Sequence, residues 1–172
     1  MDYEKLSPLD RRALAGLYDS KQMKPERREE LYPVVLRVAS RVSVVVRCAR
    51  GIDDRGLHVT NIEALACALE RLAPGEEATC LVDGFSLRGC AVPHRAVIEG
   101  DGTSAAIAAA SVIAKVSRDR YMHGAAGEHP GWGFEEHVGY STPEHRAAIE
   151  RLGISPLHRR SFQSVAYSQL AL

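Results

Sequence analysis

The sequence predicts an α/β or mixed fold, in which strands and helices alternate through the middle of the chain. Two short apolar runs, at 78–85 and 94–101, have the length and composition of buried strands. Residues 40–50 alternate in period two through Val42, Val44 and Val46, which is typical of a further strand. An almost wholly apolar helix is predicted to follow the second run, from about 103 to 122.

Three helices are predicted in the N-terminal half, two of them from capping residues. Ser7 is expected to be the N-cap of a short helix that has Pro8 at its first position and ends near Gly16. A second helix is predicted within 24–39. Thr60 and Glu63, three residues apart, resemble a capping box that opens a helix over 61–75.

The C-terminal part is predicted to consist of a loop, a helix and a basic turn. Residues 124–140 are rich in glycine and predict a loop. Thr142 is expected to cap a helix over 143–152, with Gly153 just past its end. Residues 155–172 predict a basic turn that leads into a C-terminal helix.

Composition gives weaker information about function. The 172 residues suit one domain, 1–172, and 22 basic and 22 acidic residues cancel, so overall charge does not point to nucleic acid or membrane. The four cysteines form no C-x-x-C pair, and with no signal peptide visible we expect reduced thiols in the cytoplasm. No run approaches about twenty apolar residues, so no membrane span is expected.

Two aspartates, Asp83 and Asp101, stand where the two apolar runs give way to loops. Functional groups collect beyond the carboxyl ends of strands in α/β sheets, so parallel, adjacent strands would make these carboxylates converge. A confined carboxylate pair favours a divalent cation, because the two charges otherwise repel. The alternative is that each aspartate only caps the loop or helix after it.

The long helix carries two polar residues, Ser111 and Lys115, in its apolar stretch. At about 100° per residue they share a narrow stripe that is expected to face a polar crevice, with the rest of the helix packed. A hydroxyl followed one turn later by an ammonium can hold a phosphate oxygen. Pairing of Lys115 with Asp119 is the alternative, and the spacing does not decide between them. The stripe consists of Ser104, Ala108, Ser111, Lys115, Arg118 and Met122.

Several stretches resemble, in order, consecutive motifs of the ribonuclease HII family: GLYDSKQMKPERREELY, GIDDRGLHVTNIEALACAL, LVDGF, VIEGDGTSAAIAAASVIAKVSRDRYM and HPGWGFEEHVGYSTPEHRAAIERLGISPLHRRSFQSV. The resemblance covers nearly the whole chain. It implies an RNase H-like α/β core, a mixed sheet flanked by helices, with a helical C-terminal part. It also implies an endoribonuclease that cuts RNA in RNA–DNA hybrids and at ribonucleotides embedded in duplex DNA, by two-metal-ion hydrolysis with Mg²⁺ or Mn²⁺ that leaves a 5′-phosphate and a 3′-hydroxyl. A monomer without membrane partners is expected.

The resemblance also assigns roles to single residues. Asp83 and Asp101 correspond to the third and fourth metal-binding carboxylates of the family, and Asp119 to a helix residue that binds no metal. Tyr140 resembles the tyrosine that packs on the sugar at the RNA–DNA junction, although ordinary loop packing is the alternative. The residues implied near the nucleic-acid backbone or at the closing motif are Lys21, Ser111, Lys115, Arg159 and Arg160.

The first two carboxylates of the family lie in an Asp-Glu-Ala-Gly-Arg-Gly segment that this sequence does not contain. We therefore expect an N-terminally truncated family member, with only part of the carboxylate set that balances two divalent ions. Two alternatives remain: a catalytically inactive remnant that only binds nucleic acid, and another nuclease or transposase on the same core fold.

Overall fold

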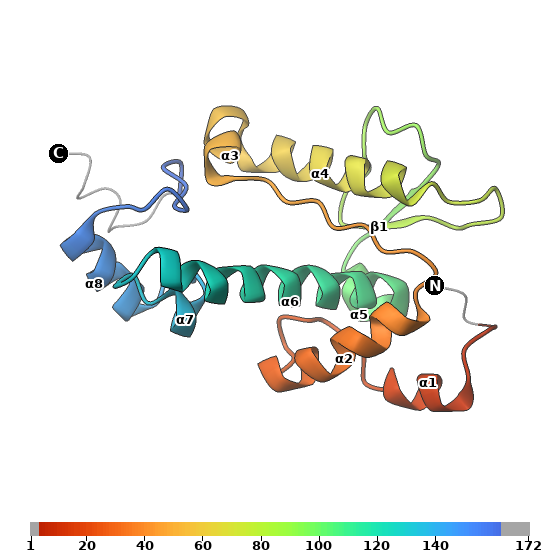
Figure 1. Ribbon diagram of the computed structural model, residues 1–172. Coiled ribbons are helices and arrows are strands. Elements are labelled where there is room, and N and C mark those ends of the chain that lie inside the picture. The colour runs from red at the N-terminus through yellow and green to blue at the C-terminus, as the bar shows by residue number, and fades with distance from the viewer. Residues whose placement is uncertain (1–3, 163–172) are drawn as a thin grey trace. The chain divides into compact units, whose positions relative to one another are not determined.

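The computed structural model describes residues 4–162 and divides the chain into two compact units. Of the described residues, the first unit takes in 4–45 and 62–116, and the second takes in 46–61 and 117–162. Helices and a small sheet occur together, so the mixed α/β class is confirmed (Figure 1). In chain order the elements are α1 (Pro8–Ala13), α2 (Pro25–Val38), α3 (Ala49–Arg55), α4 (Leu57–Leu72), β1 (Leu81–Asp83), β2 (Arg95–Val97), α5 (Gly100–Thr103), α6 (Ala105–Glu128), α7 (Phe134–His137) and α8 (Pro143–Leu152).

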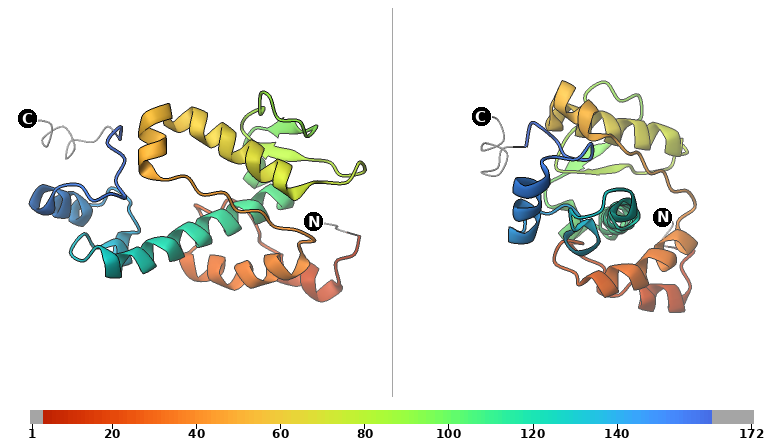
Figure 2. Two further views of the ribbon diagram at one scale, coloured as in Figure 1. Left: turned by 45° about the horizontal axis from the view of Figure 1, so that its top comes forward. Right: turned by 60° about the vertical axis from the view of Figure 1, so that its left-hand side comes forward.

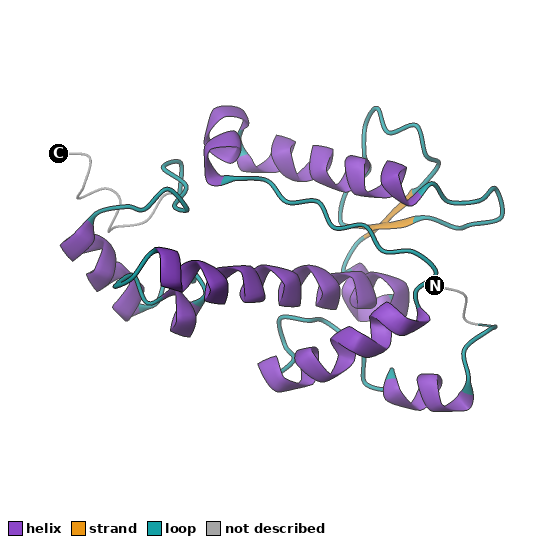
Figure 3. Ribbon diagram, in the orientation of Figure 1, coloured by secondary structure: helices purple, strands orange, loops and turns teal. Residues whose placement is uncertain are grey.

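The sheet of the first unit pairs β1 with β2 in parallel (Figure 3). Leu81 lies opposite Arg95 and Asp83 opposite Val97, and the N–H of Gly84 donates to the Val97 carbonyl at 2.8 Å. The two predicted strands are therefore present, each shorter than its apolar run. Because the strands are parallel, their carboxyl ends lie at the same edge of the sheet.

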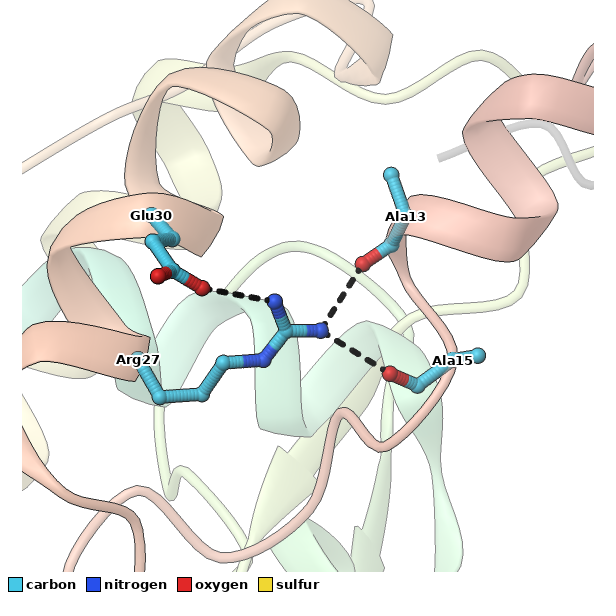
Figure 4. Close-up of polar contacts among 4 residues, drawn as sticks. All are labelled: Ala13, Ala15, Arg27 and Glu30. Carbon is cyan, nitrogen blue, oxygen red and sulfur yellow. Dashed lines mark hydrogen bonds and ion pairs between the residues drawn. The ribbon is translucent and has the colours of Figure 1, made fainter.

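Helix α1 of the first unit begins where its predicted cap places it. Ser7 accepts a hydrogen bond from the Asp10 N–H at 3.1 Å, which confirms the predicted cap of α1. Arg27 of α2 then donates to the carbonyls of Ala13 and Ala15 at 3.2 and 3.1 Å and to Glu30 at 3.0 Å (Figure 4). These bonds satisfy carbonyls at the end of α1 and tie α1 to α2.

The core of the first unit lies between α2 and the N-terminal half of α6 (Figures 1 and 2). Leu31 and Val112 are fully buried there, and burying such a side chain stabilises the fold by about 1.5–3 kcal/mol. The two neighbouring buried clusters consist of Met23, Leu31, Val112 and Val116, and of Val35, Ala109 and Ile113.

The strand predicted over residues 40–50 is wrong. Residues 41–48 have no regular structure, and α3 begins at Ala49 (Figure 3). Val42, Val44 and Val46 are exposed by 43%, 45% and 73%. A strand needs a partner for its ladder of hydrogen bonds, and among residues 4–162 no strand pairs with this segment. The period-two pattern of the sequence does not show whether such a partner strand is present.

The capping box predicted at Thr60 is also wrong. Helix α4 begins three residues earlier at Leu57, directly after Gly56, whose positive φ of 84° ends α3. The Thr60 N–H donates to the Gly56 carbonyl at 3.1 Å, as in a helix interior. Its Oγ1 is buried without a hydrogen-bond partner among the described residues, so it caps nothing there.

In the second unit, α7 and α8 lie near the C-terminal end of α6 (Figure 1). The predicted loop over 124–140 is partly wrong, because α6 continues to Glu128 and α7 occupies 134–137. Burial of Met122 and Ala125 outweighs the helix-breaking tendency of the nearby glycines. The cap of α8 is confirmed, since Thr142 Oγ1 accepts from the His145 N–H at 3.2 Å.

The C-terminal helix predicted after the basic turn falls within 163–172 and lies outside the described residues. Within residues 4–162, each helix is too short or too polar to cross a bilayer. The single domain predicted for 1–172 stays a prediction, since two compact units can belong to one domain.

Candidate functional site

Asp83 and Asp101 belong to the first unit and are linked through the backbone of one glycine. Asp83 is the last residue of β1, and its Oδ1 accepts a hydrogen bond from the Gly100 N–H at 2.9 Å. Asp101 follows directly, in the first turn of α5. The predicted parallel, adjacent strands are confirmed, but Asp101 does not end a strand. Strand β2 stops at Val97, and Glu99, at φ 51°, turns the chain into α5.

Gly100 allows this close approach because it has no side chain. A Cβ at this position would collide with Cδ1 of Ile107 and would lie 3.2 Å from Asp83 Oδ1. Gly100 is buried, so the chain has no room to shift outward. The glycine therefore sets the distance between the end of β1 and the turn that carries Asp101.

Asp19 adds a third carboxylate that sequence reasoning missed. The pKa of Asp19 is lowered chiefly by the Lys21 N–H, which donates to Oδ1 at 2.8 Å, then by the Gln22 side chain at 3.0 Å and, more weakly, by the nearby Asp101 side chain. Asp19 is the first residue of the motif DSK, in which the sequence predicted a role only for Lys21.

These carboxylates are hard oxygen donors of the type that Mg²⁺ and Mn²⁺ bind. Among residues 4–162, no group of three or more His, Cys, Asp or Glu side chains is placed so that it could hold a metal ion. Mg²⁺ is commonly held by one or two carboxylates together with substrate phosphates. The donors at this edge of the sheet therefore fit a divalent cation whose remaining ligands come from a phosphate.

A pair of serines anchors the DSK segment to α6. Ser20 is 2% exposed, and its Oγ lies 2.6 Å from the Oγ of Ser111. Arg28 of α2 donates to the Ser20 carbonyl at 2.8 Å. Lys21, the next residue, is exposed, and Lys115 is half-buried one turn after Ser111. Ser111 thus has a structural partner, which its spacing from Lys115 did not predict.

The prediction that one stripe of α6 faces a polar crevice while the rest of the helix is packed is wrong. Ala108, which belongs to the stripe, is 1% exposed, whereas Ala105, Ala110 and Ala114 on other faces are exposed. Alanine loses little by exposure, so an alanine-rich helix does not reveal its buried face. Asp119 pairs with Arg118 at 3.3 Å.

Tyr140 belongs to the second unit and follows a tight turn. Val138 and Gly139 both have positive φ, 42° and 81°. Arg118 of α6 donates to the Val138 carbonyl, and its guanidinium lies 5.4 Å from the centre of the Tyr140 ring. Tyr140 as a whole remains 52% exposed. Arg118 therefore holds the turn while leaving much of the tyrosine accessible.

Arg159 and Arg160 lie in a turn that Asp53 of α3 caps. The Asp53 carboxylate accepts from the N–H of Arg160 at 2.8 Å, and from the N–H and hydroxyl of Ser161 at 2.9 and 2.6 Å. These bonds lower the pKa of Asp53, and the bond from the Ser161 hydroxyl has the largest effect. The Arg159 guanidinium lies 5.2 Å from the Phe162 ring centre. Asp53 was missed because its contacts are more than a hundred residues away.

A cavity of about 300 Å³ in the second unit brings these turns together. Guanidinium groups and aromatic rings are the side chains that hold phosphates and stack on sugars or bases. This cavity is therefore suited to a nucleic-acid backbone. Its charged and aromatic lining consists of Arg118, Phe134, Tyr140, His145, Arg146, His158, Arg159 and Phe162.

Comparison with known proteins gives one consistent family. The family model described as Ribonuclease HII matches residues 8–165. A protein of Nocardia farcinica named Ribonuclease HII is 49% identical over 162 residues, which cover 93% of this chain and 63% of that protein. Proteins of the same name from Mycobacterium avium and Rhodococcus opacus are 49% and 48% identical, over 93% and 94% of this chain and 69% and 71% of theirs. The chain thus spans about two thirds of the length of these relatives.

Proposed function

This chain belongs to the ribonuclease HII family, and we propose that it is a metal-dependent endoribonuclease acting on RNA–DNA hybrids and on ribonucleotides embedded in duplex DNA. The observation that carries the proposal is the hydrogen bond from Gly100 to Asp83, which brings Asp101 to the end of β1. The proposal includes an RNase H-like core, supported by the parallel pairing of β1 with β2.

Asp83 and Asp101 are the proposed ligands of Mg²⁺ or Mn²⁺, with Asp19 beside Asp101. A divalent cation bound there would activate water and offset the charge of the phosphate under attack. The contribution of the chain is positional, because Gly100 holds the two ligands at one edge of the sheet. The proposed products are a 5′-phosphate and a 3′-hydroxyl.

The remaining site residues are proposed to hold the nucleic acid. Lys21, Ser111 and Lys115 are assigned to the backbone, and Arg159 and Arg160 to phosphates beside the cavity of the second unit. Tyr140 offers an exposed ring to a sugar, where the 2′-hydroxyl distinguishes RNA from DNA. Binding through these cations should weaken with increasing salt, because each phosphate contact releases counterions.

The test is cleavage of a labelled DNA duplex that contains one ribonucleotide, with Mn²⁺, with Mg²⁺ and with a chelator. We expect metal-dependent cleavage that Asp83→Asn slows by about 100-fold or more, which corresponds to a loss of about 3 kcal/mol of transition-state stabilisation. Asp54→Asn is the matched control, because Asp54 is an exposed carboxylate of α3. Duplex affinity, measured by fluorescence anisotropy, should be the same in both variants.

Two outcomes would contradict this function. Tight binding without cleavage in either metal would leave only a binding role. Equal cleavage by the Asp83→Asn variant and the unchanged chain would remove Asp83 from the site.

A further inference from the structure

Two buried histidines of the second unit have no role in the proposed reaction. His145 lies in α8, and His158 lies in the turn that precedes Arg159; the two residues are 5% and 7% exposed. Their Nε2 atoms are 3.0 Å apart, the distance of a hydrogen bond. This pair lies at the inner wall of the cavity that Tyr140 and Arg159 border.

The direction of the hydrogen bonds through the pair is determined at both ends. The Ser155 N–H can only donate, and it lies 2.9 Å from Nδ1 of His158. The Tyr140 carbonyl can only accept, and it lies 2.8 Å from Nδ1 of His145. His158 therefore carries its proton on Nε2 and donates to Nε2 of His145, which carries its proton on Nδ1 and donates to Tyr140. Both rings are neutral in this arrangement.

The chain of hydrogen bonds connects two turns that are distant in the sequence. At one end it holds the carbonyl of Tyr140, whose ring borders the cavity. At the other end it holds His158, the residue before Arg159. The Ser155 hydroxyl, 2.8 Å from the same Nδ1, closes that end.

An additional proton on either ring breaks the chain. A fully protonated His145 would direct an N–H at the N–H of His158. Moving the His158 proton to Nδ1 would place it against the Ser155 N–H, even where the Ser155 hydroxyl accepts it. Every arrangement with three ring protons therefore sets two donors against each other at one link.

The surroundings also disfavour such a proton. His137 stacks on His145 with the ring centres 4.1 Å apart, and the Phe134 ring lies 5.8 and 5.6 Å from the two imidazole centres. Burial lowers the pKa of His145. The pKa of His158 is lowered to about 4, chiefly by burial and secondly by the charge of the nearby His145. The other titratable or charged groups around the pair are Arg118, His129, Glu144, Arg146 and Arg159, and, bordering His158 from a second cavity, Arg50, Asp53, Asp54 and Arg160.

We propose that His145 and His158 are positioning residues whose neutral, hydrogen-bonded rings hold the Tyr140 turn and the Arg159 turn in one arrangement, which protonation releases. The effect of this arrangement on substrate rests on the function proposed above. The coupling of the two turns does not, and it can be measured without substrate.

The test is nuclear magnetic resonance of the uniformly ¹⁵N-labelled chain between pH 7.5 and 4. At pH 7.5 the ring nitrogens of His145 and His158 should show one protonated nitrogen each, Nδ1 and Nε2 respectively. As the pH falls, the amide signals of Tyr140 and Arg159 should move together with the ring signals. Independent titration of the rings near pH 6.5, with both amides unmoved, would overturn the proposal.

His158→Asn tests the middle link, because the asparagine Oδ1 can still accept from Ser155 while the donor to His145 is lost. The amide shifts of Tyr140 and Arg159 should then no longer be coupled, and hybrid affinity at pH 7.5 should fall by about tenfold. His123→Gln, at an exposed position of α6, should behave as the unchanged chain. If His158→Asn does not fold, the titration of the unchanged chain still decides. A chain that binds no hybrid at any pH would contradict the proposed function, while the amide shifts still test the coupling.

Discussion

The carboxylate of Asp83 and the backbone N–H of Gly100 form a 2.9 Å hydrogen bond that joins the end of β1 to the start of α5. This bond satisfies a helix N-terminal donor, which is a common role for aspartate, and it also determines where the next residue, Asp101, lies. The capping and metal-binding interpretations of Asp83 are therefore compatible, since the bond to Gly100 uses only Oδ1.

Gly100→Ala should disturb the fold and the carboxylates together. The added methyl group would collide with Ile107 and crowd Asp83, so we expect the free energy of unfolding to fall by about 1–3 kcal/mol. Mn²⁺ affinity, measured by calorimetry, should fall as well. Gly102→Ala in the same helix is the control, because nothing lies within 4 Å of its Cβ position. Equal urea-unfolding curves for the two variants would contradict the close approach at Gly100.

Tyr140→Ala should reduce selectivity for the ribonucleotide more than affinity for the backbone. Loss of an aromatic contact with a sugar or base costs about 1–3 kcal/mol, so the ratio of affinities for ribonucleotide-containing and all-DNA duplexes should fall about tenfold. Tyr121→Ala removes a tyrosine of similar exposure from α6 and should leave the ratio unchanged. An unchanged ratio for Tyr140→Ala would exclude the ring from sugar recognition.

Asp53→Ala should loosen the turn that carries Arg159 and Arg160. Three hydrogen bonds to Asp53 would be lost, and hybrid affinity should fall about fivefold, with the salt dependence of binding reduced as phosphate contacts are lost. Asp54→Ala, next in the same helix, is the control. Identical binding by the two variants at low salt would show that this turn does not hold phosphate.

The second unit should lose stability in mild acid. The pKa of His145 and that of His158 are lowered in the folded chain, the latter to about 4. Between pH 6.5 and 4 the unfolded chain therefore binds more protons, and the free energy of unfolding should decrease as pH falls, by up to about 1.4 kcal/mol per pH unit for each histidine. Above pH 6.5 this contribution is constant.

Urea unfolding can measure this slope through the fluorescence of Trp132, the single tryptophan, which donates to the Gly153 carbonyl at 3.0 Å in the same unit. Four carboxyl groups also have lowered pKa values, but the stability they contribute is lost only as the pH falls further, into the range where carboxyl groups titrate. They belong to Asp10, Asp19, Asp53 and Glu144. His158→Asn should flatten the slope between pH 6.5 and 4. A flat profile for the unchanged chain would mean that the pair titrates alike in both states.

The predictions that succeeded depend on contacts between near neighbours. The caps at Ser7 and Thr142 each close over three residues, and both are present. The predictions that failed needed information from elsewhere in the chain. Thr60 and Glu63 have the spacing of a capping box, but α4 begins upstream of them, directly after Gly56. The alternating valines at 42–46 have no partner strand among the described residues.

The sequence by itself determined the family, the α/β class and the residue types available for chemistry, because motifs and periodicity are local properties of the chain. The tertiary structure alone decided which of those residues meet. It placed Ser20 against Ser111 and His145 against His158, pairs separated by 91 and 13 residues. Such contacts form only when packing offsets the entropy of closing the intervening chain, and no local pattern records that balance.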